Sequence, residues 1–167
     1  MCSAPGGKSI QIANRLKNGF LISNEIIKSR ANILESNIER MGLKNVCITN
    51  NSPIELEKFF KGIFDAIVVD APCSGEGMFR KDDNAIANWS SENVQTCADR
   101  QLEILESANK MLKNGGYILY STCTFSVEEN ESVVMKFCER HNYNIIKLDY
   151  TLASRGVKLN GVNTDYA

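Results

Sequence analysis

The chain has 167 residues, of which 43% are hydrophobic and 23% are charged, a balance typical of one globular domain with a sizeable core. Its formal net charge of −1 argues against a strongly basic clamp for nucleic acid. No stretch resembles a signal peptide or is apolar for long enough to span a membrane, so we expect a cytoplasmic protein with no membrane partner. The six cysteines include no Cys-x-x-Cys pair, which argues against a zinc site and for free thiols.

A glycine loop opens the chain. Residues 1–9, Met-Cys-Ser-Ala-Pro-Gly-Gly-Lys-Ser, are followed by a helical pattern that stops at Gly19. Such a loop normally follows a strand, and its free amides favour an anionic or polar ligand. We therefore expect that the strand before Met1 is missing and that the chain is a fragment or is truncated at its start. A nucleoside-triphosphate P-loop does not fit, because position 2 holds Cys where that motif needs Gly.

Strands and helices then alternate along the chain, which is typical of an α/β fold with one doubly wound, mainly parallel sheet. The predicted strands cover 20–23, 46–49, 64–69, 116–121 and 144–148. The missing first strand would lie between the strands at 20–23 and 64–69, so we expect a gap there or direct contact of those two strands. Residues 149–167 form a polar tail.

Two further patterns concern the connections. Residues 76–97 lack periodicity and predict a long polar loop, a kind of segment that is often functional. Ser126 and Glu129 predict a capping box that opens the last helix. Trp89, within the long loop, either anchors the loop or stacks on a base. His141 suits a helix end and needs no catalytic role.

An acid and two thiols follow predicted strands. Asp70 and Cys73 come after the third strand and Cys123 after the fourth, at the carboxyl ends where α/β sheets bind ligands. Most cysteines are small buried hydrophobes. The cysteines that fit this structural role are Cys47, Cys97 and Cys138. By contrast, Cys73 and Cys123 lie in polar surroundings, where amides or Lys8 favour a thiolate, and each is either reactive or structural on position alone.

Glu25 lies 18 residues after Gly7. This is close to the offset of about 20 residues at which an acid binds ribose hydroxyls in dinucleotide-type folds. The bland alternative is a solvated acid at a helix start. In combination with the glycine loop, we favour the ribose role.

Three motifs carry a resemblance to a known family. They are the glycine loop at 1–9, Asp-Ala-Pro-Cys-Ser-Gly-Glu-Gly-Met-Phe-Arg-Lys at 70–81, and Tyr-Ser-Thr-Cys-Thr-Phe-Ser-Val-Glu-Glu-Asn-Glu at 120–131. Together they resemble the Sun-type RNA (cytosine-5) methyltransferases, and the second is similar to the bacterial ribosomal-RNA branch. The resemblance covers 1–148 and implies a partial catalytic domain with a Rossmann-like, S-adenosylmethionine-dependent methyltransferase fold, lacking the first strand and the C-terminal end.

The resemblance also implies a division of labour. Cys123 attacks C6 of a flipped-out cytosine in RNA, and C5 then accepts a methyl group from S-adenosylmethionine. Cys73 assists removal of the C5 proton and release of the enzyme. Asp70 and Lys8 hold the base, and Asp70 also approaches the cofactor.

The cofactor-binding residues implied by the resemblance lie on the glycine loop and after the strands. They are Cys2, Ser3, Ala4, Pro5, Gly6, Gly7, Lys8, Glu25, Asn51, Ser52 and Asp70. Asn51 and Ser52 stand where the family often has an acid near the adenine, which departs from its pattern. We expect a monomer that acts on rRNA rather than tRNA without a metal. The alternative is a catalytically incompetent fragment that retains the fold and partial RNA contacts.

Overall fold

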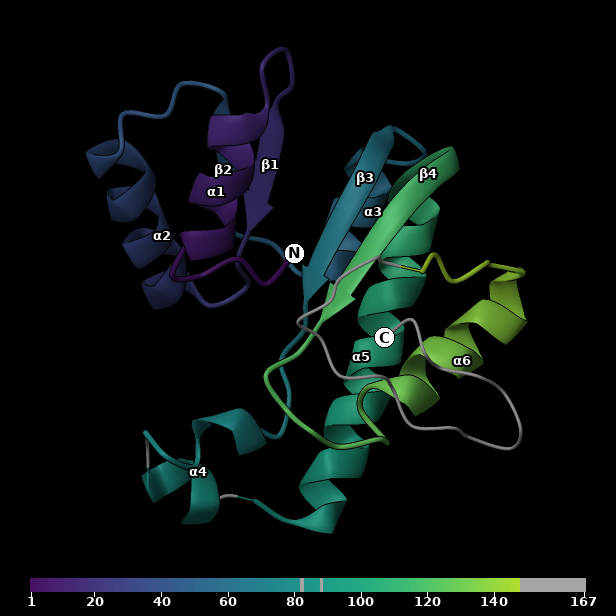
Figure 1. Cartoon of the computed structure of the whole chain (residues 1–167). Coiled ribbons are helices and arrows are strands. Elements are labelled where there is room, and N and C mark those ends of the chain that lie inside the picture. The colour runs from purple at the N-terminus through teal and green to yellow at the C-terminus, as the bar shows by residue number, and fades with distance from the viewer. Residues whose placement is uncertain (82, 88, 148–167) are drawn as a thin grey trace. The chain divides into compact units, whose positions relative to one another are not determined.

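The structure is a computed structural model that describes residues 1–81, 83–87 and 89–147. Its elements in chain order are α1 (Gly7–Arg15), β1 (Leu21–Asn24), α2 (Lys28–Arg40), β2 (Val46–Thr49), α3 (Pro53–Phe59), β3 (Phe64–Asp70), the 3₁₀ turn η1 (Glu76–Met78), α4 (Asp83–Ala87), α5 (Ser91–Met111), β4 (Leu112–Ser121) and α6 (Glu131–His141). Figure 1 shows them along the chain. The tail predicted at 149–167 lies outside the described residues.

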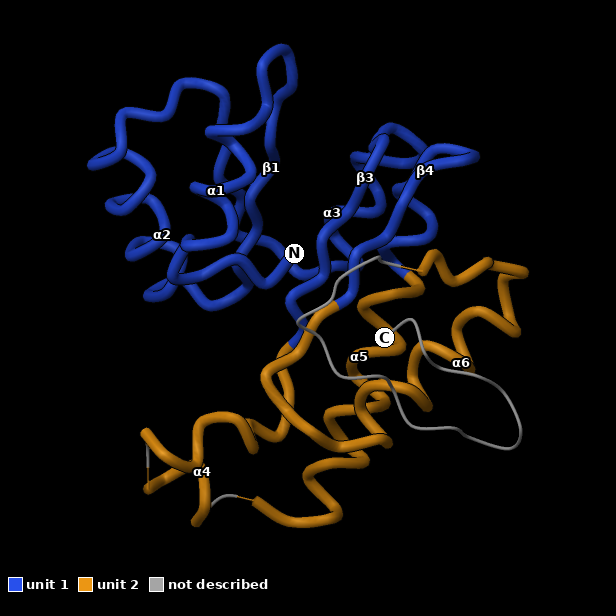
Figure 2. The backbone as a smooth tube through the Cα atoms, in the orientation of Figure 1, with its two compact units in different colours: residues 1–71, 107–120 blue, residues 72–106, 121–167 orange. Residues whose placement is uncertain are grey.

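Two compact units divide the chain, and Figure 2 colours them differently. Unit 1 comprises Met1–Ala71 and Ser107–Tyr120, and unit 2 comprises Pro72–Glu106 and Ser121–Ala167. The boundary therefore falls directly after β3, within α5 and near the end of β4. Within the described ranges, no helix is both long enough and apolar enough to cross a membrane.

The first half of unit 1 is built on the pair β1–β2. These strands run parallel, with Leu21 opposite Val46 at one end and Asn24 opposite Thr49 at the other. Helix α1 contacts β1 and helix α2 contacts β2. Apolar residues spaced three and four apart give α2 one buried face, because such spacing returns to the same side of a helix. These buried residues are Ala31, Leu34 and Ile38.

The second half of unit 1 is built on the pair β3–β4. The two strands are hydrogen-bonded neighbours, and their arrows point the same way in Figure 1. Gly116 of β4 allows close approach, since a β-carbon there would lie 2.9 Å from the carbonyl oxygen of Asp65. The chain entering β3 is tied to the end of α5, where the Ile63 amide donates to the Met111 carbonyl at 2.9 Å.

These pairs confirm the α/β class and the parallel strand direction but correct the expected single sheet. The described strands form two separate two-stranded sheets, in which β1 pairs with β2 and β3 pairs with β4. A cavity of about 700 Å³ is lined by β1 and β3, together with residues of α1, α3 and the glycine loop. The expectation of a gap between the strands at 20–23 and 64–69 is therefore confirmed.

The element bounds differ from the predictions in several places. The turn η1 and helix α4 lie inside the stretch 76–97 predicted as loop, and β4 begins at Leu112 instead of residue 116. Helix α5 begins at Ser91, inside the stretch predicted as loop, because Ser90 accepts a hydrogen bond from the Asn93 amide and so caps a first turn that is polar and exposed. The strand predicted at 144–148 is absent over 144–147, and residue 148 lies outside the described residues. A strand persists only when a neighbour completes its ladder, and no described strand pairs with this segment.

The described part of unit 2 is mainly helical. Apolar residues on one side of α5 are buried, together with two residues of α6. These residues are Val94, Cys97, Ala98, Leu102, Leu105, Val133 and Phe137. His141, at the end of α6, lies 2.7 Å from the carboxylate of Glu106, so it serves a helix end as expected.

Candidate active site

The glycine loop lies at the carboxyl end of β1 and is held there by its own backbone. The Ser3 amide donates to the Asn24 carbonyl at 2.9 Å. Gly6 precedes the first helical residue and adopts a φ of 110°, which side-chain-bearing residues rarely adopt. A β-carbon at Gly6 would also lie 2.9 Å from the Leu34 side chain. Both the backbone angle and the packing therefore require glycine here.

The carboxylate of Glu25 is hydrogen-bonded to the glycine loop. Its side chain is buried, and its two carboxylate oxygens accept from the amides of Ala4 and Ile27, each at 3.2 Å. Arg30 lies 4.0 Å from the same carboxylate and donates to the Ala4 carbonyl at 3.0 Å. The predicted ribose contact of Glu25 stays a prediction, while the structure shows a carboxylate that shapes the loop.

Asn51 and Ser52 follow β2 at the same edge of its sheet. The Asn51 amide donates to the Asn24 side-chain oxygen at 3.1 Å, and its carbonyl accepts from the same side chain at 2.9 Å. Ser52 forms a capping box with Glu55 at the start of α3. Both residues are thus fixed at the turn where the resemblance places the adenine, and their contact with a cofactor stays a prediction.

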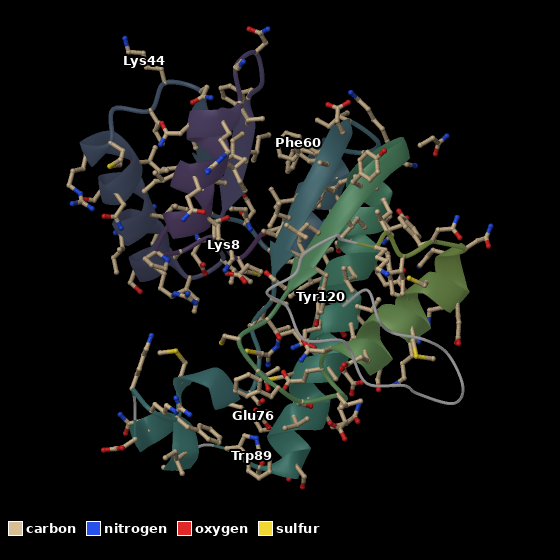
Figure 3. The ribbon with its side chains drawn as sticks, viewed as in Figure 1. Lys8, Lys44, Phe60, Glu76, Trp89 and Tyr120 are labelled. Carbon is tan, nitrogen blue, oxygen red and sulfur yellow. The ribbon has the colours of Figure 1, made fainter. Side chains whose placement is uncertain are left out.

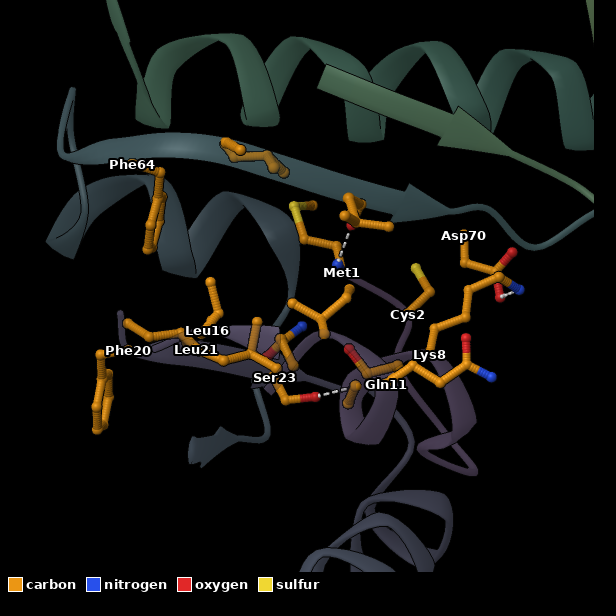
Figure 4. Close-up of a pocket in the computed structure, with 18 of the residues that line it drawn as sticks. Met1, Cys2, Lys8, Gln11, Leu16, Phe20, Leu21, Ser23, Phe64 and Asp70 are labelled. Carbon is orange, nitrogen blue, oxygen red and sulfur yellow. Dashed lines mark hydrogen bonds and ion pairs between the residues drawn. The ribbon is translucent and has the colours of Figure 1, made fainter. Parts of the chain in front are cut away.

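Lys8 and Asp70 form an ion pair at the end of β3. The Lys8 Nζ atom lies 2.7 Å from Asp70 Oδ2, and both side chains are partly exposed. Figure 4 shows this pair at the edge of the cavity of unit 1. The N-terminal amine of Met1 donates to the Val68 carbonyl in the same strand. The structure therefore unites two residues that the sequence separates widely.

The cavity of unit 1 has the size of a small-molecule pocket. Its volume of about 700 Å³ lies within the range of about 300–1,000 Å³ of typical ligand pockets. Figure 4 shows Cys2, Lys8 and Asp70 towards one end of the cavity and the apolar side chains of Phe20 and Phe64 towards the other. Burial raises the pKa of the Cys2 thiol, so this group stays neutral beside the cavity.

The two thiols that the sequence singled out touch one another in unit 2. The Sγ atoms of Cys73 and Cys123 lie 3.2 Å apart, although 50 residues separate them. Both cysteines are free, and Cys123 is exposed while Cys73 is half-buried. The Gly77 amide donates to the Cys123 carbonyl at 2.8 Å, and a β-carbon on Gly77 would overlap that carbonyl oxygen. This contact fixes the loop of Cys123 against the loop of Cys73.

The thiol pair is chemically asymmetric. Burial, followed by the hydrogen bond with Cys123, raises the pKa of Cys73 to about 12. Cys73 therefore keeps its proton at neutral pH. Once deprotonated, a thiolate with so high a pKa is a stronger base than an ordinary cysteine thiolate.

Glu76 joins the long loop to the loop of Cys123. One of its carboxylate oxygens accepts from the Trp89 indole at 3.1 Å, and the other accepts from the Phe125 amide at 3.0 Å. Figure 3 labels Glu76 and Trp89 side by side in unit 2. Trp89 is thus a loop anchor, yet 42% of its surface remains exposed.

Two buried residues bind the neighbours of Cys73: Glu129, for which the sequence predicted another role, and Gln101, which the sequence did not single out. The Ser-x-x-Glu pattern predicted that Glu129 would cap its own helix, which is wrong. The Glu129 amide does donate to the Ser126 hydroxyl at 3.3 Å. Its carboxylate instead accepts from the Ser74 amide at 3.0 Å, because that amide lies within reach across the fold. The described residues contain no group of three or more His, Cys, Asp or Glu side chains placed to hold a metal.

Comparison with known proteins places the chain in a family. The family described as 16S rRNA methyltransferase RsmB/F matches residues 1–163. Ribosomal RNA small subunit methyltransferase F of Vibrio cholerae serotype O1 is 46% identical over 134 residues, which cover 80% of this chain and 28% of that protein. The protein of the same name from Escherichia coli O157:H7 is 46% identical over 136 residues, covering 81% and 28% respectively. This chain therefore spans less than a third of the length of these curated relatives.

A solved structure agrees with the sequence relatives. NSun6 from Pyrococcus horikoshii, solved with SFG, superposes with a TM-score of 0.83 at 32% identity, covering 98% of this chain and 41% of that one. The match confirms the Rossmann-like, S-adenosylmethionine-dependent methyltransferase fold. The resemblance drawn from the three motifs is likewise confirmed, and the chain belongs to the 16S rRNA methyltransferase RsmB/F family.

Proposed function

We propose that this chain methylates C5 of a cytosine in rRNA with S-adenosylmethionine, through a covalent bond between Cys123 and C6 of the base. The observation that carries the proposal is the 3.2 Å contact of Cys73 and Cys123, since two adjacent thiols suit a reaction in which one forms the bond and the other assists its breakage. The membership of an rRNA methyltransferase family supports RNA as the substrate. Small-molecule methyl transfer without a covalent step leaves both thiols unexplained.

Cys123 is the proposed nucleophile. It is the exposed member of the pair and therefore the one that a flipped-out base can reach. Attack of its thiolate on C6 places electron density on C5, which then becomes nucleophilic. S-adenosylmethionine, when bound, supplies the electrophilic methyl group.

Cys73 is the proposed base of the second half of the reaction. After methylation, C5 carries both its original hydrogen and the new methyl group. Having lost its own proton to solvent, the Cys73 thiolate takes the C5 proton, the C5–H electrons re-form the C5–C6 double bond, and the Cys123–C6 bond breaks. Burial and the hydrogen bond with the Cys123 thiol raise the pKa of Cys73 in the free chain. The bond of Cys123 to C6 removes the second of these causes, so Cys73 gives up its proton more readily in the adduct than in the free chain.

Lys8 and Asp70 are proposed to hold the base and the cofactor at the cavity of unit 1. Asp70 presents a carboxylate to the N3/N4 edge of cytosine, and Lys8 compensates negative charge that develops on the ring. The ion pair between them orients both side chains before the ligands arrive. Residues 2–5, 7 and 8 line the cavity, and we propose that the loop supplies backbone groups for the cofactor.

The test is a trapping experiment with 16S rRNA and labelled S-adenosylmethionine. We expect Cys73→Ala to accumulate a slower-migrating, RNA-linked protein that survives denaturation, because the adduct then lacks its route to release. Cys123→Ala should abolish both the adduct and methylation. Cys47→Ala is the matched control and should behave as the parent chain. Cys47 of β2 is exposed, so its expected role as a buried structural cysteine is wrong.

The other outcomes are equally informative. Trapping by Cys123→Ala instead of Cys73→Ala would reverse the two roles. Binding of RNA without methylation or adduct in any variant would favour a catalytically incompetent fragment that retains partial RNA contacts. Mapping the label to a base other than cytosine would refute the proposed substrate.

A further inference from the structure

A buried carboxylate, Glu129, binds the residue next to Cys73. Glu129, between β4 and α6, has 0% exposed surface. Its two oxygens accept from the Ser74 amide at 3.3 and 3.0 Å, and Oε2 also accepts from the Gln101 side-chain amide at 2.8 Å. Gln101 of α5 is itself fully buried. A buried carboxylate is costly unless hydrogen bonds compensate it, so its position is defined by these donors.

The contacts of this pair grip the chain on both sides of Cys73. The Gln101 amide that donates to Glu129 also donates to the Pro72 carbonyl at 2.9 Å. Glu129 binds the amide of Ser74. Pro72 and Ser74, on either side of Cys73, are therefore both hydrogen-bonded to the buried pair of Glu129 and Gln101. These bonds limit the directions in which the Cys73 side chain can point.

Glu129 is also connected to the loop of Cys123. Glu129 lies on that loop, six residues after Cys123. The Thr124 hydroxyl, next to Cys123, lies 3.1 Å from the Ser74 hydroxyl, and Thr122 donates to Asn130 at 2.7 Å. A shift of Glu129 would thus move the two cysteine loops relative to one another.

We propose that Glu129 is the positioning residue of the thiol pair: with Gln101, it fixes the peptide on both sides of Cys73 and thereby sets the 3.2 Å contact with Cys123. A helix cap formed by Glu129 would leave this contact unaffected, because a cap acts on its own helix. The consequence for catalysis rests on the proposed function. The geometric role does not, and it can be measured without RNA.

The experiment measures how readily the two sulfurs join. Oxidised glutathione converts the two thiols into one protein disulfide and leaves two molecules of reduced glutathione, so that the protein loses two hydrogens. The 167-residue chain is mixed with oxidised glutathione, and the Cys73–Cys123 disulfide is followed by intact mass and peptide mapping. We expect Glu129→Gln to slow this disulfide at least about tenfold, since misplacement by about 1 Å can cost about 100-fold. Mixed glutathione adducts should accumulate instead.

Glu128→Gln is the matched control, because it makes the same chemical change one residue away. Glu128 accepts a hydrogen bond from the Ser126 hydroxyl, whereas the bonds from Ser74 and Gln101 go to Glu129. Its disulfide should form at the parent rate. Circular dichroism and thermal unfolding report whether each variant is folded. If Glu129→Gln does not fold, Gln101→Met carries the test, because it removes the donor to both Pro72 and Glu129 while keeping a similar volume.

Two results would overturn the inference: folded Glu129→Gln or Gln101→Met protein that forms the disulfide at the parent rate, or equal slowing by Glu128→Gln. Failure of the proposed function would appear differently, as absent methylation with an intact difference between Glu129→Gln and Glu128→Gln. In the methylation assay, Glu129→Gln should lower kcat and leave the KM for S-adenosylmethionine nearly unchanged. If the lower kcat came only from unfolded protein, dividing the rate by the folded fraction would restore the parent kcat.

Discussion

Lys8 Nζ lies 2.7 Å from Asp70 Oδ2, although 62 residues separate the two side chains in the chain. The pair joins the first helix to the end of β3 beside the cavity. Because both side chains are partly exposed, water screens their attraction, and the pair contributes little to stability. An ion pair that adds little stability and lies at the rim of a cavity is typical of residues that bind a ligand.

The first prediction concerns Asp70. We expect Asp70→Asn to change the free energy of unfolding by less than about 1 kcal/mol, yet to reduce methyl transfer strongly, since its carboxylate would no longer hold the base. Urea unfolding and a methylation assay measure the two effects. Asp65→Asn is a matched control at the other end of β3, where it breaks the exposed pair with Lys113. Equal loss of methylation in both variants would contradict the role of Asp70.

The second prediction concerns the glycine loop. Gly6→Ala should lower the free energy of unfolding by about 1–3 kcal/mol, because alanine resists the φ of 110° and its β-carbon would press on Leu34. Gly7→Ala is the control. Apart from its chain neighbours and its own helix backbone, no atom of the described residues lies within 4 Å of a β-carbon at Gly7, which begins α1. Thermal unfolding of both variants decides the matter, and comparable stabilities would show that the loop relaxes freely.

The third prediction concerns Gly77. A side chain there would overlap the Cys123 carbonyl, so Gly77→Ala should push the two cysteine loops apart and slow formation of the Cys73–Cys123 disulfide. Gly75→Ala separates this effect from simple backbone strain. Gly75 has a φ of 82°, but apart from its chain neighbours no atom of the described part of the chain lies within 4 Å of a β-carbon placed there. Its replacement should cost about 1–2 kcal/mol without a comparable loss of disulfide. Similar disulfide rates in the two variants would argue against the overlap.

The fourth prediction concerns pH. Because burial and the bond with Cys123 raise the pKa of Cys73 to about 12, iodoacetamide should modify Cys73 at pH 8 at least about a hundredfold more slowly than an ordinary thiol. Cys123→Ala removes one cause of the shift and should speed this reaction. A folded-state pKa above the unfolded value of 9.0 also means that the contribution of Cys73 to stability is complete below pH 9 and is lost as the pH rises towards 12.

Peptide mapping after timed alkylation measures the reactivity of Cys73. The reaction is run between about pH 7 and pH 10, the range in which an ordinary thiol loses its proton. Cys47 is the internal reference, since it is an exposed thiol in the same chain. Modification of Cys73 as fast as Cys47 would show that the pKa is not raised.

The fifth prediction concerns RNA affinity. With a net charge of −1, the chain should bind 16S rRNA weakly and with a steep salt dependence. Arg80 and Lys81 are exposed on the long loop and are the expected phosphate contacts. Replacing either with Ala should reduce the slope of log K against log salt by about one. Filter binding at several salt concentrations measures this slope. Lys44→Ala, which removes an exposed lysine of unit 1, is the control and should leave the slope unchanged.

The parts of the fold that the sequence predicted correctly are those with a strong local pattern. The alternating strands and helices are visible in periodicity, and Cys73 and Cys123 could be placed at one edge because both follow parallel strands. The strand at 144–148 was wrong because a short apolar run becomes a strand only when another strand lies beside it. That partner cannot be read from the run itself.

The early start of α5 and the role of Glu129 show a second limit. A polar, exposed first turn has no apolar stripe, so Ser91 carried no helical signal until the cap by Ser90 was seen. Ser-x-x-Glu has the same spacing whether the carboxylate returns to its own helix or reaches another loop. Only the folded chain shows that Glu129 meets Ser74, because that contact spans 55 residues.

The amine of Met1 has a practical consequence for producing the protein. It lies beside β3, donates to the Val68 carbonyl, and burial lowers its pKa, so a full positive charge there is unfavourable. Any residue added before Met1 would turn this amine into a peptide N–H, which still donates to Val68 but carries no charge. Such an extension would begin beside β3, at the cavity that Met1 lines.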